Sequence, residues 1–203
     1  VEKLDLDAIG CGPYYHREPL ANDRYRDEWG TVYQADTELY GSPLGGPIHS
    51  TDDLKRYTPP DPMAEDRLGD LPNYVKRFKG KRAIIWHQRE AFMTTALLSG
   101  LQDFLVMLYD QPSLVRVMVD MVVDVHVQLV RRAVRAGADV VSLGDDYAGR
   151  TGPLMSVPMF REFFLPGIKR VVQAAHEEGA LVIKHTDGNF WLLMDSFIEA
   201  GVE

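Results

Sequence analysis

The most constraining feature of this sequence is an alternation of short apolar runs with long helical patterns between residues 80 and 203. Three runs, at residues 83–87, 140–144 and 180–185, each follow closely on a glycine. Their length and apolar content are typical of strands buried on both faces of a parallel sheet. Strands that alternate with helices in this way predict parallel β/α units.

Helical spacing of apolar residues predicts helices at residues 90–99, 101–109, 112–136, 157–179 and 190–200. Pro112 suits the first turn of the longest helix, and Gly137 is placed to end it. Ser156 is a helix cap for the following helix, with Pro158 in its first turn. Pro166 predicts a kink or a division of that helix, because proline lacks the backbone donor that a helix interior needs.

The first 79 residues are less regular. We expect residues 1–28 to be polar and loop-like, residues 29–34 to form a strand, and residues 39–48 to supply a second short strand in a hairpin. Short helices are predicted at residues 54–57, capped by residues 50–53, and at 71–78. We therefore expect one domain over residues 1–203, with a lead-in at 1–79 and β/α units at 80–203. The chain begins with Val1 and stops after a helix-ending glycine, so we interpret it as an internal fragment of a longer protein.

Repeated β/α units suit either an incomplete (β/α)8 TIM barrel or an open doubly wound sheet of the α/β class. The sequence contains no G-x-G-x-x-G and no G-x-x-x-x-G-K-[ST] phosphate loop. This absence weakens the nucleotide-binding open sheet, and we predict the barrel.

Composition excludes several classes of function. The net charge of -8 argues against nucleic-acid binding, which needs clustered Lys and Arg. The short basic groups at residues 76–82 and 131–135 are better interpreted as solvated faces. No apolar run reaches the ~18 residues of a membrane span, and we expect no signal peptide. Cys11 is the only cysteine, which excludes an internal disulfide framework and favours a cytoplasmic location.

Ionisable residues gather where each predicted strand ends. In a β/α barrel the active site lies at the carboxyl ends of the strands, so these residues should converge on one rim. The candidate catalytic residues are Asp145, Asp146, His185 and Asp187, and the candidate substrate contacts are His87, Arg89 and Tyr147.

His185 and Asp187 are two positions apart, which puts both side chains on one face of an extended segment. This spacing suits a shared metal ion or a histidine oriented by a carboxylate, although a strand-end histidine can also simply cap a loop. Asp145 and Asp146 are candidates for a base, a metal ligand or an orienter of substrate, and only one of them should enter the pocket because adjacent residues point to opposite faces.

Arg89 can bind a substrate carboxylate through its planar fork, or it can form a salt bridge to Glu90 or to a rim aspartate. Trp29, Trp86 and Trp191 are interpreted as core or rim packing residues, not as a stacking platform. Cys11 has no partner that would activate it, so we do not expect a nucleophile there.

Four stretches resemble the uroporphyrinogen decarboxylase superfamily, which contains the porphyrinogen decarboxylase and corrinoid-linked methyltransferases. Residues 144–164, GDDYAGRTGPLMSVPMFREFF, resemble its D-S-x-A-G loop and the serine-proline-capped helix with M-F-x-E-F. Residues 165–179, LPGIKRVVQAAHEEG, resemble its L-P-x-x-K-R helix. Residues 185–188, HTDG, and 27–30, DEWG, resemble the methyltransferase-like branch. The resemblance implies a (β/α)8 barrel, here incomplete.

The resemblance also sets expectations for chemistry. It implies a methyltransferase that moves a methyl group between a small methylated donor and a corrinoid protein, with zinc held by His185 and Asp187. Asp187 stands where thiol-activating members have a cysteine, and an oxygen ligand makes a harder Lewis-acid site. Uroporphyrinogen decarboxylation without a cofactor is an alternative, although Ala96 occupies the place of that enzyme's pocket tyrosine. A barrel that binds a tetrapyrrole or small acid without catalysis is a third.

Overall fold

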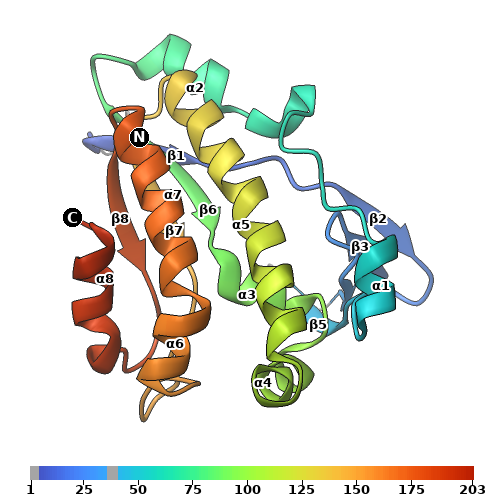
Figure 1. Cartoon of the computed structure of the whole chain (residues 1–203). Coiled ribbons are helices and arrows are strands. Elements are labelled where there is room, and N and C mark those ends of the chain that lie inside the picture. The colour runs from blue at the N-terminus through green and yellow to red at the C-terminus, as the bar shows by residue number, and fades with distance from the viewer. Residues whose placement is uncertain (1–4, 36–40) are drawn as a thin grey trace.

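The computed structural model describes residues 5–35 and 41–203. Four strands form a parallel sheet: β1 (Ala8–Cys11), β6 (Ala83–Arg89), β7 (Val140–Gly144) and β8 (Leu181–His185), in the order β1-β6-β7-β8. The three predicted strands are therefore confirmed, and the first strand of the sheet comes from a stretch that we expected to be loop. The sheet is not closed into a barrel within the described residues, as an incomplete β/α barrel requires (Figure 1).

Helices cover one face of this sheet. α5 (Pro112–Arg135) and α7 (Leu165–Glu177) lie side by side in front of β6, β7 and β8, with α8 (Met194–Ala200) at the edge (Figure 1). The remaining helices of this part are α3 (Ala91–Leu97), α4 (Leu101–Asp110), α6 (Val157–Phe163) and a 3-10 turn at Trp191–Leu193. The predicted helix at 157–179 is divided at Phe164, and Pro166 lies in the first turn of the second half. This division confirms the role predicted for Pro166.

The two faces of the sheet differ in what covers them. Val182 in β8 faces the helices and is fully buried, whereas its neighbours Leu181 and Ile183 are 56% and 40% exposed. The same alternation buries Ile84 and Trp86 in β6 against the helix layer. Side chains at the intervening positions therefore project from the uncovered face, where the candidate site is found.

The expectation of a loop over residues 1–28 is wrong. After β1 the chain forms an antiparallel sheet of β2 (Arg17–Leu20), β3 (Arg24–Asp27), β4 (Val32–Gln34) and β5 (Ser42–Gly45). Asn22 and Asp23 both have positive φ, at 60° and 53°, in the three-residue loop between β2 and β3, a conformation that Asn and Asp adopt more readily than most residues. Strands β2 and β3 are polar and partly exposed, so backbone pairing forms them without an apolar alternation.

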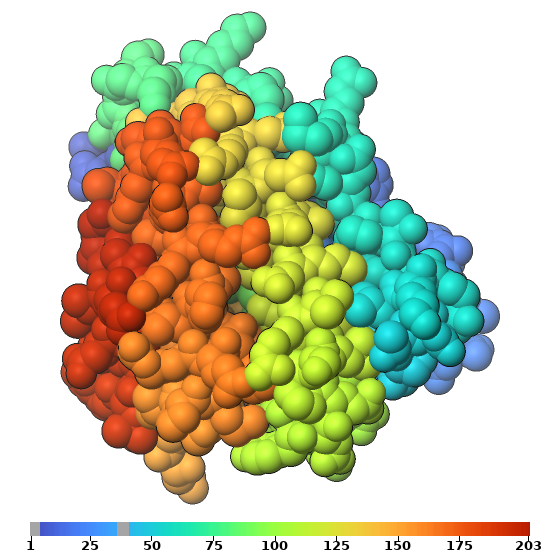
Figure 2. Space-filling model, in the orientation of Figure 1, coloured from blue at the N-terminus to red at the C-terminus, as the bar shows by residue number. Residues whose placement is uncertain are grey.

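The β4–β5 pairing confirms the predicted hairpin, and residues 36–40 of that prediction lie outside the described residues. α1 (Thr51–Arg56) begins earlier than predicted, and the Ser50 hydroxyl accepts a hydrogen bond from the Asp53 backbone N–H at 3.2 Å. The prolines that follow lead to a 3-10 turn, η2 (Glu65–Leu68), and to α2 (Leu71–Phe78), which was predicted. In Figure 2 the segment around α1 packs directly on the surface of α5 and α4.

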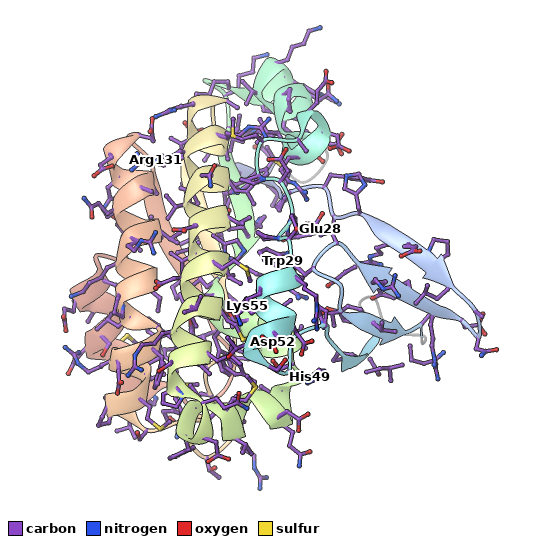
Figure 3. The ribbon with its side chains drawn as sticks, turned by 45° about the vertical axis from the view of Figure 1, so that its right-hand side comes forward. Glu28, Trp29, His49, Asp52, Lys55 and Arg131 are labelled. Atoms are coloured by element: carbon purple, nitrogen blue, oxygen red, sulfur yellow. The ribbon has the colours of Figure 1, made fainter. Side chains whose placement is uncertain are left out.

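The turn between β3 and β4 joins the antiparallel sheet to the rest of the molecule. Glu28 forms an ion pair with Arg67 in which both side chains are more than nine-tenths buried. The neighbouring Trp29 packs edge-on against His126 of α5, with ring centroids 5.9 Å apart. Glu28 and Trp29, both labelled in Figure 3, lie between α5 and the antiparallel sheet. The antiparallel sheet is thus held against α5 at a turn that carries buried side chains.

No single helix within residues 5–35 and 41–203 is long and apolar enough to span a membrane. Only α3 and α4 counted as one segment meet the length and composition criteria, and they are bent by 100° at the break between them.

Candidate functional site

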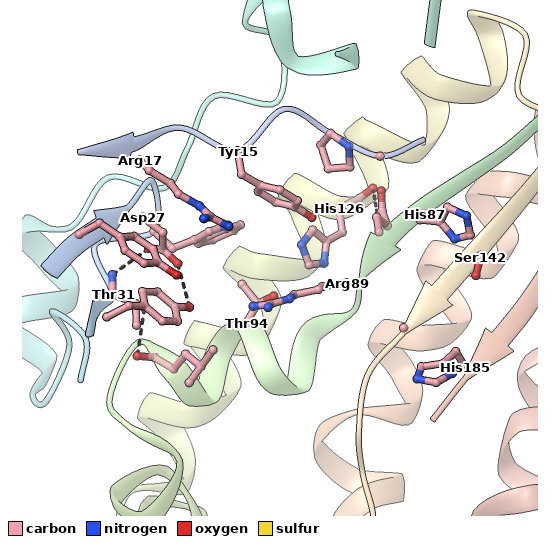
Figure 4. A pocket seen from close by; sticks show the side chains of 18 residues that line it. Tyr15, Arg17, Asp27, Thr31, His87, Arg89, Thr94, His126, Ser142 and His185 are labelled. Atoms are coloured by element: carbon pink, nitrogen blue, oxygen red, sulfur yellow. Dashed lines mark hydrogen bonds between the residues drawn. The ribbon is translucent and has the colours of Figure 1, made fainter. Parts of the chain in front are cut away.

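A cavity of about 720 Å³ opens at the carboxyl ends of β6, β7 and β8. Its walls come from the uncovered face of the parallel sheet, from the segment between β1 and β2, from the antiparallel sheet, and from α3 and α5. Figure 4 shows Arg89 and Tyr15 on one side and His185, Ser142 and His87 on the other. The cavity lies where the sequence predicted the polar strand ends to converge.

The strand register explains this convergence. Arg89 is paired with Gly144, and Gly144 with His185, so the three residues lie level across the sheet. Neighbouring strands are about 4.8 Å apart, which separates the Cα atoms of Arg89 and His185 by roughly 10 Å. Gly144 has no side chain to fill this gap, and a Cβ placed there would meet nothing closer than His185 Cδ2 at 3.9 Å. The cavity floor is therefore open between the arginine and the histidine.

At the end of β7, the candidate catalytic residue Asp145 does not line the cavity. Asp145 is 3% exposed and faces the helix layer, where its carboxylate accepts hydrogen bonds from the Phe92 and Met93 backbone N–H groups at 2.8 and 2.9 Å. Burial and the nearby Glu90 raise the pKa of Asp145 to about 7. Asp145 stabilises the first turn of α3 from behind the sheet.

Tyr147 is also placed behind the sheet and not in the cavity. Its ring is fully buried, and its hydroxyl donates a hydrogen bond to Glu90 Oε2 at 3.0 Å. Glu90 in turn forms an ion pair with Lys184 at 3.1 Å, in which the two side chains are 1% and 5% exposed. The predicted substrate contact at Tyr147 is therefore replaced by a structural contact in a buried polar network.

Asp146 is the residue of this pair that reaches the cavity rim. Its carboxylate lies 3.9 Å from His185 Nε2, and the Asp187 carboxylate lies 3.7 Å from the same nitrogen. The Asp187 backbone N–H donates a hydrogen bond to Asp146 Oδ1 at 2.9 Å, which ties the ends of β7 and β8 together. The three side chains are half or more exposed, and His185 also lines the cavity.

The donor chemistry of this cluster fits a zinc ion. One donor atom from each of Asp146, His185 and Asp187 lies within 4.8 Å of the others. Zinc bonds to nitrogen and oxygen of ~2.1 Å in a tetrahedral site place neighbouring donors about 3.4 Å apart. Since the observed distances of 3.7 and 3.9 Å are close to this value, small side-chain movements would complete a three-ligand site with one open position.

Sequence reasoning missed a second polar group, which comes from the antiparallel sheet. Asp27 at the end of β3 accepts hydrogen bonds from the Thr31 backbone N–H at 2.9 Å and from the Tyr33 hydroxyl at 3.1 Å. Burial raises the pKa of Asp27 despite these bonds. Burial also raises the pKa of Tyr33, and that of Tyr15 across the cavity, to about 12. The D-E-W-G stretch marked this turn, but nothing in it indicated a place in the cavity.

Arg89 lies at the end of β6 with its side chain open to the cavity (Figure 4). Burial opposes its charge, while the hydroxyl of Tyr33 and that of Tyr15 help to raise its pKa above the ordinary value. Neither salt bridge considered for Arg89 forms, because Glu90 pairs with Lys184 and the guanidinium has no carboxylate within 4.0 Å in the described part of the chain. The substrate-binding interpretation of Arg89 stays a prediction.

Two histidines complete the cavity wall. His126 of α5, which the sequence did not single out, is 5% exposed, and burial together with Arg89 lowers its pKa to about 3. Burial also lowers the pKa of His87, a predicted substrate contact that does line the cavity. Both histidines are therefore neutral at neutral pH.

The residues interpreted as packing groups behave differently from one another. Trp86 is fully buried, Trp29 is buried and also lines the cavity, and Trp191 is 75% exposed. Burial and the nearby Asp70 raise the pKa of the Cys11 thiol to about 11, so the thiolate is scarce at neutral pH. This protonation state agrees with the expectation that Cys11 is not a nucleophile.

Comparison with known proteins identifies the family. A family model described as uroporphyrinogen decarboxylase (URO-D) matches residues 37–203, most of the chain. The chain belongs to the URO-D family. The resemblance described from the motifs is thereby confirmed, and with it the (β/α)8 barrel, of which the described residues supply four parallel strands.

The URO-D chain is also similar to a solved structure, a methyltransferase from Methanosarcina mazei. The TM-score is 0.65 at 16% sequence identity, and the match covers 83% of this chain and 49% of that one. At this identity the likeness shows a shared fold. The URO-D chain spans about half the length of that structure. A search among curated proteins gave no match.

Proposed function

We propose that this URO-D chain belongs to a zinc-dependent methyltransferase that moves a methyl group between a small methylated donor and a corrinoid protein. The observation that carries the proposal is the cluster of Asp146, His185 and Asp187 beside a deep cavity. The fold shared with a methyltransferase supports the proposal independently of that cluster. Metal binding in the protein, which no comparison addresses, is the first property to measure.

Each residue of the chain has a defined task in this proposal. His185, Asp146 and Asp187 would hold the zinc ion, which when bound supplies Lewis-acid activation of the atom that carries the methyl group. Carboxylate ligands in place of thiolates favour a hard donor atom, so an oxygen-bound methyl group suits this site at least as well as a sulfur-bound one. Arg89 faces the same cavity from roughly 10 Å away and would orient the donor.

A small-molecule substrate and a corrinoid protein are the partners that this reaction requires. The exposed side of the cluster is consistent with access by a second protein, since His185 and Asp187 are 63% and 78% exposed. We expect the whole reaction to take place in the cytoplasm, and a nucleic-acid partner is not expected at a net charge of -8.

One observation favours uroporphyrinogen decarboxylase as a second candidate. The cavity contains a carboxylate, Asp27, together with Arg17 and Arg89. A carboxylate near the pyrrole nitrogens and arginines for acetate and propionate groups are what the porphyrinogen reaction would need. Two arginines are few for a substrate with that many acidic groups, so we place this candidate second.

Metal analysis tests the proposal. The protein, purified and loaded with zinc, should retain about one zinc ion per chain after gel filtration, and His185→Ala should lose it. His16→Ala is the matched control. His16 Nε2 lies 3.0 Å from an Asp66 carboxylate oxygen in an exposed pair that does not belong to the cluster. Equal zinc retention in His185→Ala and the native protein would contradict the proposal, as would metal-free protein that converts uroporphyrinogen. Metal-free protein without either activity would favour a binding barrel that is not catalytic.

A further inference from the structure

The corner of the cavity at Arg89 and His126 contains two hydrogen-bond donors that form no ion pair with a carboxylate of the described residues. Arg89 carries a full charge there, and no carboxylate lies within 4.0 Å of its guanidinium. The Arg89 side chain approaches the ring of His126, which lines the same corner (Figure 4). An arginine that faces a cavity without an ion-pair partner can bind the carboxylate of a ligand through its planar fork, which points to an anion that binds from outside.

The protonation of His126 supports the same conclusion. Its Nδ1 is buried without a hydrogen-bond partner, whereas Nε2 is not among the buried unpartnered atoms. A buried N–H without an acceptor costs more than a bare lone pair, which favours the tautomer that carries its proton on Nε2. His126 is a buried residue of α5 that lines the cavity. Its Nε2–H is therefore placed to donate a hydrogen bond toward the cavity.

The walls around these donors are aromatic. Tyr15, Trp29 and Tyr33 line the cavity on the side of Arg89, and Tyr33 stacks on Tyr25 at a centroid distance of 5.0 Å. Asp27, the carboxylate among the residues that line this cavity, accepts hydrogen bonds from the Thr31 N–H and the Tyr33 hydroxyl. The corner therefore offers positive charge at its base and flat apolar surfaces at its sides.

We propose that this corner is a subsite for the carboxylate of a small aromatic acid, held by Arg89 and His126 with the ring between the tyrosines and Trp29. The identification of this acid as the methyl donor rests on the proposed function. Across the open floor at Gly144, the opposite end of the ring would point toward His185. A methyl group carried there by a ring oxygen would then reach the cluster, which defines the donor as a methylated aromatic carboxylic acid.

Comparison of benzoate with its neutral analogue benzyl alcohol distinguishes the contribution of the carboxylate to binding from that of the ring. Titration calorimetry on the metal-free protein should detect benzoate, with benzyl alcohol at least about tenfold weaker, as expected for loss of a charge-assisted contact. Arg89→Gln should lower benzoate affinity by at least about tenfold and leave benzyl alcohol unchanged. Arg89→Lys keeps the charge but not the fork and should fall between them. His126→Phe should weaken benzoate by a smaller factor.

Arg26→Gln is the control, because Arg26 of β3 forms an ion pair with Glu18 at 2.9 Å and does not line this cavity. It should retain benzoate binding within about twofold. If benzoate does not bind, if it binds Arg89→Gln and Arg89→Lys as well as the native protein, or if Arg26→Gln is the variant that loses it, the subsite assignment is overturned.

The design keeps this inference separate from the proposed function. Benzoate binding is measured without metal and should survive His185→Ala, whereas zinc retention should survive Arg89→Gln. Benzoate bound through Arg89 in a protein that holds no zinc would support the subsite and contradict the methyltransferase. Zinc retained without benzoate binding would support the methyltransferase and contradict the subsite.

Discussion

The buried ion pair behind the cavity gives the sharpest stability prediction. Lys184 Nζ lies 3.1 Å from Glu90 Oε2, with the side chains 5% and 1% exposed. The same ammonium donates to the Asp145 and His185 carbonyl oxygens at 3.3 and 2.9 Å and lies 5.1 Å from the centre of the Tyr147 ring. Lys184→Met keeps the apolar stem between its aromatic neighbours and removes only the charge and its hydrogen bonds.

The expected cost follows from what the substitution leaves behind. Glu90 would keep the Tyr147 hydroxyl as a donor but lose its counter-charge, and its Oε1 already has no partner. Breaking a buried pair in this way costs about 3–5 kcal/mol, a large part of the ~5–15 kcal/mol that stabilises an ordinary domain. Urea unfolding followed by circular dichroism measures this loss directly.

Two further variants make the prediction refutable. Lys169→Met removes a surface pair with Glu199, whose side chains are 43% and 41% exposed, and should cost less than about 1 kcal/mol. The double variant Lys184→Met with Glu90→Gln removes both charges and should recover a large part of the stability. A cost for Lys184→Met as small as that for Lys169→Met would refute the reasoning.

Two more predictions concern β7. Burial and Glu90 raise the pKa of Asp145 to about 7, above the ~3.9 of an unfolded chain, so the folded protein holds an extra proton between these values. The free energy of unfolding should therefore fall as the pH rises through this window. In Asp145→Asn, urea titrations at a series of pH values should show a weaker dependence of the unfolding free energy on pH. A dependence equal to that of the native protein would contradict the assignment. Gly144→Ala should fold and bind benzoate normally, because a Cβ there meets only His185 Cδ2 at 3.9 Å. Gly144→Leu should block the floor and weaken benzoate by at least about tenfold, and equal affinity in the two variants would show that the ligand does not cross it.

The strands and helices after residue 80 could be predicted because continuous apolar runs and helical periodicity leave a plain signal in the sequence. Residues 140–144 and 180–185 are apolar runs between a glycine and a polar loop, and the observed β7 and β8 differ from them by at most one residue. β2 and β3 lack that signal, since their side chains are polar and only the Asn22–Asp23 turn indicates the hairpin.

The sequence shows that Asp145 and Asp146 face opposite sides of the sheet, but it does not show which side faces the cavity. Val141, Leu143 and Asp145 share one face, and Ser142, Gly144 and Asp146 share the other. In a sheet covered on both sides, apolar residues do not identify the cavity side, so parity alone leaves the choice open. Asp27 and His126 were beyond prediction for a different reason: both line a cavity whose other walls come from residues far away in the chain.

The strand ends show why a stable cavity and a buried polar network occur together. β6, β7 and β8 each end with one residue on the cavity side and a neighbour on the helix side, in the pairs Arg89 and Glu90, Asp146 and Asp145, and His185 and Lys184. The helix-side residues contact one another, because Lys184 bonds to Glu90 and to the Asp145 carbonyl oxygen. Since neighbouring residues share one peptide unit, a shift of any strand end would have to break these buried contacts. The network behind the sheet therefore fixes the spacing between Arg89 and the His185 cluster.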